Sequence, residues 1–244
     1  MRQGRCGNTA SWLVVHGLGP RHIRGPKKSA TSIWICDLRL ARKSIAGAFF
    51  ALAGCAGGVN FAGAKGVPAL ALLGGDFVAT GPAGYCADRN ASRPQTGFAI
   101  LAPCAVLGVQ NAPPAIFAMT TVQVGQTGSA IVAQDPAAFA AYLEGPSGPQ
   151  LLSRTGDAGS VSISDVTQIG DQVTVHLVDE APAAIDGAQQ DEWRAFFDVA
   201  GRLVTIAVRG LDEAPLTQAS GDALLSQTIR AIIGANAQQP ASEI

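Results

Sequence analysis

The second half of the chain contains two pairs of segments in which hydrophobic and polar residues alternate. The segments are 160–168 with 172–179, and 192–199 with 202–210. Alternation with a period of two predicts strands with one polar face, and two-residue turns containing glycine join antiparallel strands. Gly170-Asp171 and Ala200-Gly201 occupy the two turn positions. We therefore predict two β-hairpins. In the second one, alternation places Phe196 on the face opposite Trp193 and Phe197, and all three are expected to be core residues.

Two helices are predicted from capping residues and helical spacing. Asp135 and Pro136 supply an N-cap and a first-turn proline for a short helix that ends at Gly145. Ser220 is the predicted N-cap of a second, amphipathic helix that runs to about Asn236. The residues expected on its buried side are Leu224, Leu225, Thr228, Ile229, Ile232 and Ile233.

The first half predicts three further strands at 76–80, 98–104 and 115–124, the first two separated by a polar loop. Strands and helices do not alternate regularly, which indicates an α+β domain rather than a doubly wound one. We predict a single α+β domain over 71–236, an antiparallel sheet built from hairpins with the C-terminal helix packed on it. The "GPSGP" break near 145–150 marks an alternative subdivision, and residues 237–244 are predicted to be a disordered tail.

Charge is distributed very unevenly along the chain. Residues 1–43 carry nine basic side chains and one acidic one, whereas the remainder carries eight basic and 17 acidic ones. Clustered Lys and Arg are therefore not expected in the folded part, so nucleic acid is not a predicted partner. The first 38 residues lack helical or strand periodicity. We interpret them as an extension upstream of the true start, or alternatively as a disordered basic arm.

Residues 39–54 have the parts of an export signal: basic residues, about ten apolar residues, then small ones. The apolar run is shorter than the about 20 residues needed to span a bilayer. Leu52-Ala53-Gly54-Cys55 resembles the lipobox of bacterial lipoproteins. This resemblance implies cleavage between Gly54 and Cys55 and lipid attachment to the Cys55 thiol. The alternative is a buried core helix.

The same resemblance gives an expected location. In Gram-negative lipoproteins, an Asp directly after the lipidated cysteine resembles an inner-membrane retention signal. This chain has Ala56 at that position, so the resemblance implies an outer-membrane lipoprotein that faces the periplasm. Residues 55–70 are rich in Gly and Ala and are predicted to form a flexible tether. The expected partners are the membrane, through lipid on Cys55, and an envelope protein.

If the chain is exported, Cys6 and Cys36 lie in the N-terminal extension and Cys55 carries lipid. Cys86 and Cys104 then remain as an even pair in an oxidising compartment, which predicts a disulfide between them. Two buried free thiols are the alternative if the chain is cytosolic. A metal site is not predicted, because His176 is the only histidine after residue 43. No cofactor is predicted.

The search for catalytic residues finds no supported constellation. His176 lies in an alternating strand, where a solvent-facing position is expected, and no G-x-S-x-G motif surrounds a serine. The carboxylate pairs Asp179-Glu180 and Asp191-Glu192 are expected to be solvated residues at strand ends. Tyr85, directly before Cys86, and Arg89 and Arg93, in the cysteine-bounded loop, form a candidate binding loop for a partner or an anionic ligand, with an ordinary surface loop as the alternative.

Two similarities extend over parts of the folded region. The two hairpins followed by a helix are similar in hydrophobic pattern to the end of the PsbP/Mog1-like fold, and "WRAFFDVAGRLVTIAV" resembles uncharacterised lipoproteins of alphaproteobacteria. Neither similarity implies an activity. We therefore expect a lipid-anchored envelope protein with a non-catalytic binding or structural domain. The alternative is a periplasmic, hydrolase-like enzyme.

Overall fold

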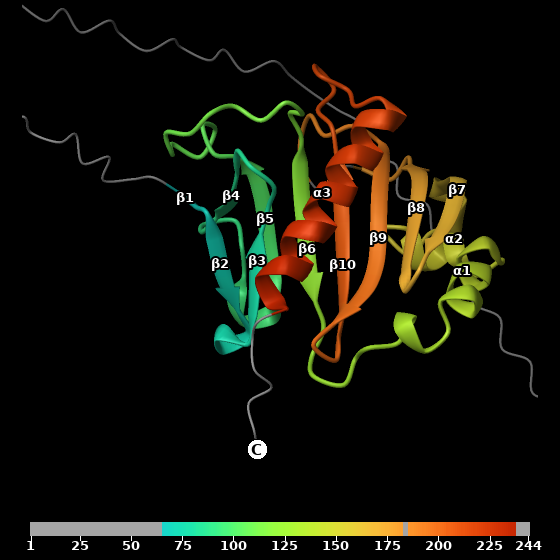
Figure 1. Ribbon diagram of the computed structural model, residues 1–244. Coiled ribbons are helices and arrows are strands. Elements are labelled where there is room, and N and C mark those ends of the chain that lie inside the picture. Colours follow the sequence, from blue (N-terminus) through green and yellow to red (C-terminus); the bar gives the residue numbers. More distant parts are fainter. Residues whose placement is uncertain (1–64, 183–184, 238–244) are drawn as a thin grey trace, which may run out of the picture. The chain divides into compact units, whose positions relative to one another are not determined.

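A computed structural model describes residues 65–182 and 185–237 of the chain, all within one compact unit (Figure 1). Its centre is an eight-stranded sheet in the order β1-β4-β5-β6-β10-β9-β8-β7. Every neighbouring pair in it is antiparallel. The eight strands are β1 (Gly66–Val67), β4 (Tyr85–Asp88), β5 (Phe98–Pro103), β6 (Met119–Val124), β7 (Val161–Ile169), β8 (Gln172–Asp179), β9 (Asp191–Val199) and β10 (Arg202–Arg209).

The remaining elements cover this sheet. They are the two-stranded sheet of β2 (Ala69–Leu72) and β3 (Phe77–Thr80), the helices α1 (Pro136–Glu144), α2 (Gly148–Leu152) and α3 (Gln218–Asn236), and four short 3-10 turns, η1 (Leu73–Gly75), η2 (Pro94–Thr96), η3 (Val132–Gln134) and η4 (Ala158–Ser160). The antiparallel sheet with the C-terminal helix packed on it confirms the predicted α+β class at this level.

The two hairpins form as predicted. β7 pairs with β8 through a turn at Gly170-Asp171, and β9 pairs with β10 through Ala200-Gly201. Ala200 and Gly201 both have positive φ angles, 50° and 72°, as expected for a turn that follows the right-handed twist of its strands. Asp135 caps α1 by accepting a hydrogen bond from the backbone N–H of Ala138.

Each face of the large sheet has its own core. On the α3 face, Trp193, Phe197 and Ile206 pack with α3 and the β2–β3 sheet, and Figure 1 shows α3 crossing this face. On the far face, Phe196 packs edge-on against Phe139 of α1, with ring centroids 5.2 Å apart. The predicted division of the three aromatic residues between the faces is confirmed.

Several predicted boundaries are wrong. The third strand of the first half, predicted at 115–124, begins only at Met119. The N-cap of α3 is Thr217, whose side chain accepts a hydrogen bond from the backbone N–H of Ser220, so Ser220 lies in the first turn. Residues 66–67 and 69–70, assigned to the tether, belong to β1 and β2 because they pair with β4 and β3. The polar loop between the cysteines contains β4, which pairs with both β1 and β5.

Candidate functional site

The far face of the sheet is only partly covered. α1 and α2 pack over β7, β8 and Phe196, and the part built by β5, β6, β10 and β9 borders a cavity of about 520 Å³. The volume falls within the range of small-molecule sites. We call this cavity the arginine pocket. Its apolar lining includes Phe98, Ile100, Met119, Ile185 and Ala207.

The alternation of side chains along the strands places these residues on one face. Cross-strand register sets Ile100 opposite Thr121, Thr121 opposite Ala207, and Ala207 opposite Arg194. This row crosses four strands and forms the floor of the arginine pocket. The intervening residues of the same strands face α3, so a single alternating pattern supplies both the core and the pocket.

The charged lining of the arginine pocket is mostly basic. It consists of four arginines and one carboxylate: Arg93, Arg154, Arg194, Arg209 and Glu192. Arg93 comes from the loop before β5 and Arg154 follows α2, while the others lie on β9 and β10. Arg194 and Arg209 therefore lie on the β9–β10 side of the cavity, whereas Arg93 pairs with Phe98 on the β5 side.

Glu192 is 1% exposed and makes ion pairs with two arginines. Its two carboxylate oxygens contact Arg194 Nε and Arg209 Nη2. Within the described part of the chain these are the only guanidinium contacts of either arginine, although each guanidinium carries five N–H donors. Most of their donors thus remain available to water or a ligand.

A second buried carboxylate, Asp179, is fully buried beside Arg154. Arg154 Nε lies 3.5 Å from Asp179 Oδ2, and the Arg154 backbone N–H donates to the same oxygen. Asp179 also accepts hydrogen bonds from Ser160 Oγ and the backbone N–H of Ala181. Arg154 Nη1 is buried without a hydrogen-bond partner among the described residues.

Burial affects the basic groups directly. Desolvation lowers the pKa of Arg194 to about 10, a shift that the charge of Asp179 opposes. Desolvation and then the charge of Arg154 lower the pKa of Arg209 to about 10, again opposed by Asp179. Both pKa values lie far above neutral pH, so both arginines are cationic there. The four arginines exceed the two carboxylates by two charges.

The three residues of the predicted binding loop are separated by the fold. Tyr85 is 4% exposed, donates to the backbone carbonyl of Ile116 and accepts from the backbone N–H of Ala118, so it is a core residue. Burial raises its pKa to about 12. Arg89 is exposed and is not among the residues that line the arginine pocket. Arg93 lines the arginine pocket.

His176 is half-buried rather than fully solvent-facing. Its ring stacks on Trp193 with centroids 4.6 Å apart, and its Nε2 lies 3.3 Å from Asp191 Oδ1. It does not line the arginine pocket. The predicted solvation of the carboxylate pairs is wrong for Asp179 and Glu192, which their arginine partners allow to be buried.

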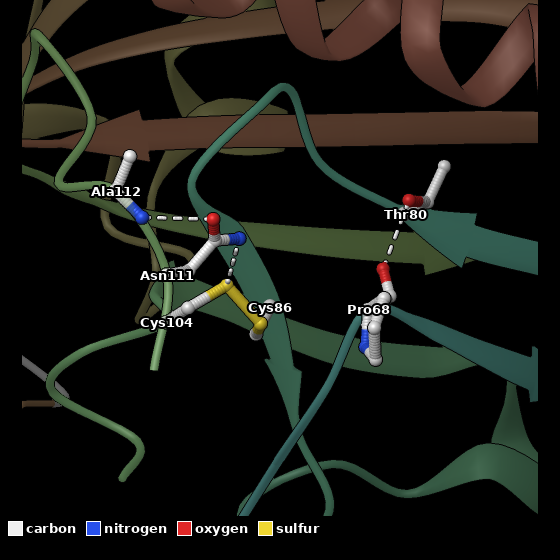
Figure 2. The surroundings of a disulfide bond; sticks show 6 residues. All are labelled: Pro68, Thr80, Cys86, Cys104, Asn111 and Ala112. Carbon is white, nitrogen blue, oxygen red and sulfur yellow. Dashed lines mark hydrogen bonds between the residues drawn. A yellow bond between two sulfur atoms is a disulfide. The ribbon is translucent and has the colours of Figure 1, made fainter. Parts of the chain in front are cut away.

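Cys86 and Cys104 form a disulfide (Figure 2), as predicted. Cys86 lies in β4, Cys104 directly follows β5, and the Cys104 backbone N–H donates to the Gly84 carbonyl. Figure 2 shows Asn111 donating from its side-chain amide to Cys104 Sγ while its carbonyl accepts from the Ala112 backbone N–H. The disulfide therefore links β4 to the end of β5.

Several predicted features lie outside the described residues: Gly54 and Cys55, the extension 1–38, the signal 39–54, tether residues 55–64 and tail residues 238–244. In the described ranges, no helix has both the length and the apolar character needed to cross a membrane. The same residues include no group of three or more His, Cys, Asp or Glu side chains arranged to hold a metal ion.

Of the charged residues that line the arginine pocket, the sequence patterns pointed only to Arg93. They did not point to Arg154, Arg194, Arg209 or Glu192. The available signal was the set of charged residues at alternating positions of β9 and β10, inside otherwise apolar strands. A charge at such a position indicates either solvent or a partner on that face. No protein-family model matches this chain, and no curated protein matches it either.

Proposed function

We propose that this protein is a lipid-anchored protein of the cell envelope whose folded domain binds a small molecule in the arginine pocket without catalysis. The observation that carries the binding role is the cavity of about 520 Å³ on the uncovered part of the far face. A concave site with an apolar floor and a few convergent polar groups is the usual form of a ligand site.

The anchoring part of this proposal rests on the sequence. Leu52-Ala53-Gly54-Cys55 resembles a lipobox, and a disulfide between Cys86 and Cys104 suits an oxidising compartment outside the cytosol. Two or more acyl chains on Cys55 would give stable anchoring, since a single chain gives only reversible membrane binding. The proposed location is the outer membrane, with the domain on the periplasmic side.

Two properties of the arginine pocket support binding rather than catalysis. Its charged groups are four arginines and a glutamate already paired with two of them, so the pocket offers donors to an anion rather than an acid and base with separated pKa values. The His176–Asp191 pair, which would suit a hydrolase, lies outside the arginine pocket, and the His176 ring is held against Trp193.

The binding role is tested with Nile red, a neutral apolar dye that fluoresces on entering an apolar site. We compare the wild type with Ala207→Phe, because Ala207 lies on the pocket floor and a phenyl ring there occupies the cavity. Saturable binding by the wild type and its loss in a variant with an unchanged melting temperature support the role. Equal fluorescence in both proteins contradicts it.

The anchoring is tested by intact-mass measurement of the protein from the membrane fraction, comparing the wild type with Cys55→Ala. We expect a mature species that begins at acylated Cys55 and is absent from the variant. An unprocessed, unacylated chain in both samples would make residues 44–54 a core helix or plain membrane segment and remove the proposed location.

A further inference from the structure

The arginine pocket is chemically divided along the direction that crosses its strands. The β5 and β6 side presents Phe98, Ile100 and Met119, whereas the β9 and β10 side presents Arg194 and Arg209. Adjacent strands lie about 4.8 Å apart, so Phe98 and Ile100 on β5 lie about 14 Å from Arg194 on β9. Met119 on β6 lies between them and directly opposite Arg209 on β10. A ligand that fills the cavity therefore contacts an apolar region at one end and guanidinium groups at the other.

The basic end is not neutralised by the protein. Arg154, Arg194 and Arg209 face two carboxylates, Asp179 and Glu192, which leaves one positive charge in excess at this end. Arg154 Nη1 is buried and lacks a hydrogen-bond partner among the described residues. Arg209 is only 8% exposed, so its charge is held largely out of bulk water.

Uncompensated buried cations are costly unless an anion accompanies them. Guanidinium groups bind carboxylate and phosphate oxygens through paired N–H donors, and hydrogen bonds between charged partners are stronger than neutral ones. A neutral apolar ligand would fill the β5–β6 side but leave the arginine donors without acceptors. A small inorganic anion would satisfy the donors but leave the apolar floor exposed to water.

We propose that the ligand of the arginine pocket is a single-chain amphiphile with an acidic head. Its carboxylate or phosphate accepts hydrogen bonds from Arg154, Arg194 and Arg209, and its hydrocarbon chain lies along Phe98, Ile100 and Met119. This inference rests on the binding role proposed above and specifies the chemical class of the ligand.

The test is a set of calorimetric titrations of the whole protein with five probes. Dodecyl phosphate and dodecanoate carry both parts of the expected ligand. Dodecanol lacks the charge, dodecyltrimethylammonium reverses it, and inorganic phosphate lacks the chain. All amphiphiles are kept below their micelle-forming concentrations. We expect one-to-one binding of the two acids, with dodecanol and the ammonium probe at least about tenfold weaker, since a hydrogen bond to a charged group changes affinity by about that factor or more.

A variant pair tests the head-group contact. Arg194→Gln keeps a polar partner for Glu192 but removes the charge, whereas Arg89→Gln removes an exposed arginine that does not line the cavity. We expect Arg194→Gln to weaken dodecyl phosphate binding by about tenfold and to leave dodecanol binding unchanged. Arg89→Gln should match the wild type for both probes.

The possible failures are separable. Dodecanol binding as tightly as dodecanoate and dodecyl phosphate overturns the acidic head but leaves the binding role intact. Inorganic phosphate binding as tightly as dodecyl phosphate overturns the apolar chain. If no probe binds and Nile red also fails to bind, both this inference and the proposed binding role are wrong. If only one acid binds tightly, the inference holds and the head is identified as carboxylate or phosphate.

Discussion

Glu192 is the residue on which the electrostatics of the arginine pocket depend most. It is 1% exposed on the far face of the sheet and contacts two guanidinium groups, Arg194 and Arg209. Removing one partner of a buried ion pair leaves the other charge desolvated and unpaired, which costs more than the pair contributes when intact. The glutamate is therefore expected to stabilise the folded state even without ligand.

The first prediction is that Glu192→Gln lowers the free energy of unfolding by about 3 kcal/mol, because two buried guanidinium groups lose their shared counter-charge. Asp76→Asn is the matched control. Asp76 pairs with Arg202, but its side chain is 61% exposed, so its loss should cost about 1 kcal/mol or less. Urea unfolding at pH 7 measures both values, and similar small losses in the two variants would contradict the prediction.

The second prediction concerns pH. Burial raises the pKa of Asp179, but hydrogen bonds from Arg154, Ala181 and Ser160, with the charge of Arg154, outweigh this and leave the pKa below 3.8. A carboxyl whose pKa is lower in the folded state stabilises the fold above its unfolded pKa. The contribution should be lost as the pH falls below 3.8 and through the folded-state pKa.

Urea unfolding of the wild type and Asp179→Asn as a function of pH measures this contribution. The difference in unfolding free energy should be constant near neutral pH and shrink as the solution is acidified below about pH 4. A difference that stays constant down to about pH 2 would mean that the pKa of Asp179 is the same in the folded and unfolded states, which contradicts the prediction.

The sequence pointed to Arg93, which lines the arginine pocket, but not to the buried charges, and the physical reason is local. Asp179 and Glu192 each stand next to another carboxylate at a strand end, a context in which solvation is usual. Asp179 and Glu192 can be buried because they pair with Arg154, Arg194 and Arg209. Arg154 and Arg209 lie in other segments than the carboxylates with which they pair. Tyr85 was misplaced for a related reason, since its hydrogen bonds go to Ile116 and Ala118, outside its own segment.

At the scale of elements, α3 is held close to the sheet at one glycine. A Cβ on Gly221 would overlap the indole of Trp193, which is 1% exposed on β9. The helix can therefore approach the sheet at this point only if position 221 has no side chain. Trp193 in turn supports the His176 ring on β8.

The third prediction is that Gly221→Ala destabilises the protein by about 2 kcal/mol, because either α3 or Trp193 must shift to admit the methyl group. Gly234→Ala is the matched control in the same helix, where a Cβ meets nothing within 4 Å. Alanine favours helix over glycine, so this variant should gain about 0.5–1 kcal/mol. Tryptophan fluorescence during urea unfolding follows both, and equal effects would rule out the close contact.

Elements were predictable where the signal was local. Two-residue turns such as Ala200-Gly201 determine a hairpin by themselves, and Asp135 with Pro136 does the same for the start of α1. β4 was missed because four residues among turn formers become a strand only by pairing with β1 and β5. At α3, both Thr217 and Ser220 are good N-cap residues, and the sequence could not decide between them.

At the scale of the whole described domain, one sheet carries two cores. Phe197 belongs to the core under α3 and Phe196 to the core under α1 and α2, so neighbouring residues of β9 support opposite layers. The layers share β9 and β10, and neither can lose its packing without disturbing strands that the other needs.

The fourth prediction is that Phe196→Ala and Phe197→Ala each cost about 3–5 kcal/mol and that both variants unfold in a single transition. Near-ultraviolet circular dichroism and far-ultraviolet circular dichroism, recorded on the same urea titration, should coincide. A separate early transition in Phe196→Ala alone would mean that the segment containing α1 and α2 unfolds on its own, as the alternative subdivision near residues 145–150 implies.

The two ends of the large sheet are poor sites for edge-to-edge association. One edge, β1, offers only two residues for pairing, and the other, β7, has an irregular register between Ile163 and Asp165. Short or bulged edges with charged residues are poor templates for an incoming strand. Neighbouring copies at high local concentration would therefore find no continuous strand to extend, which disfavours fibrous assembly.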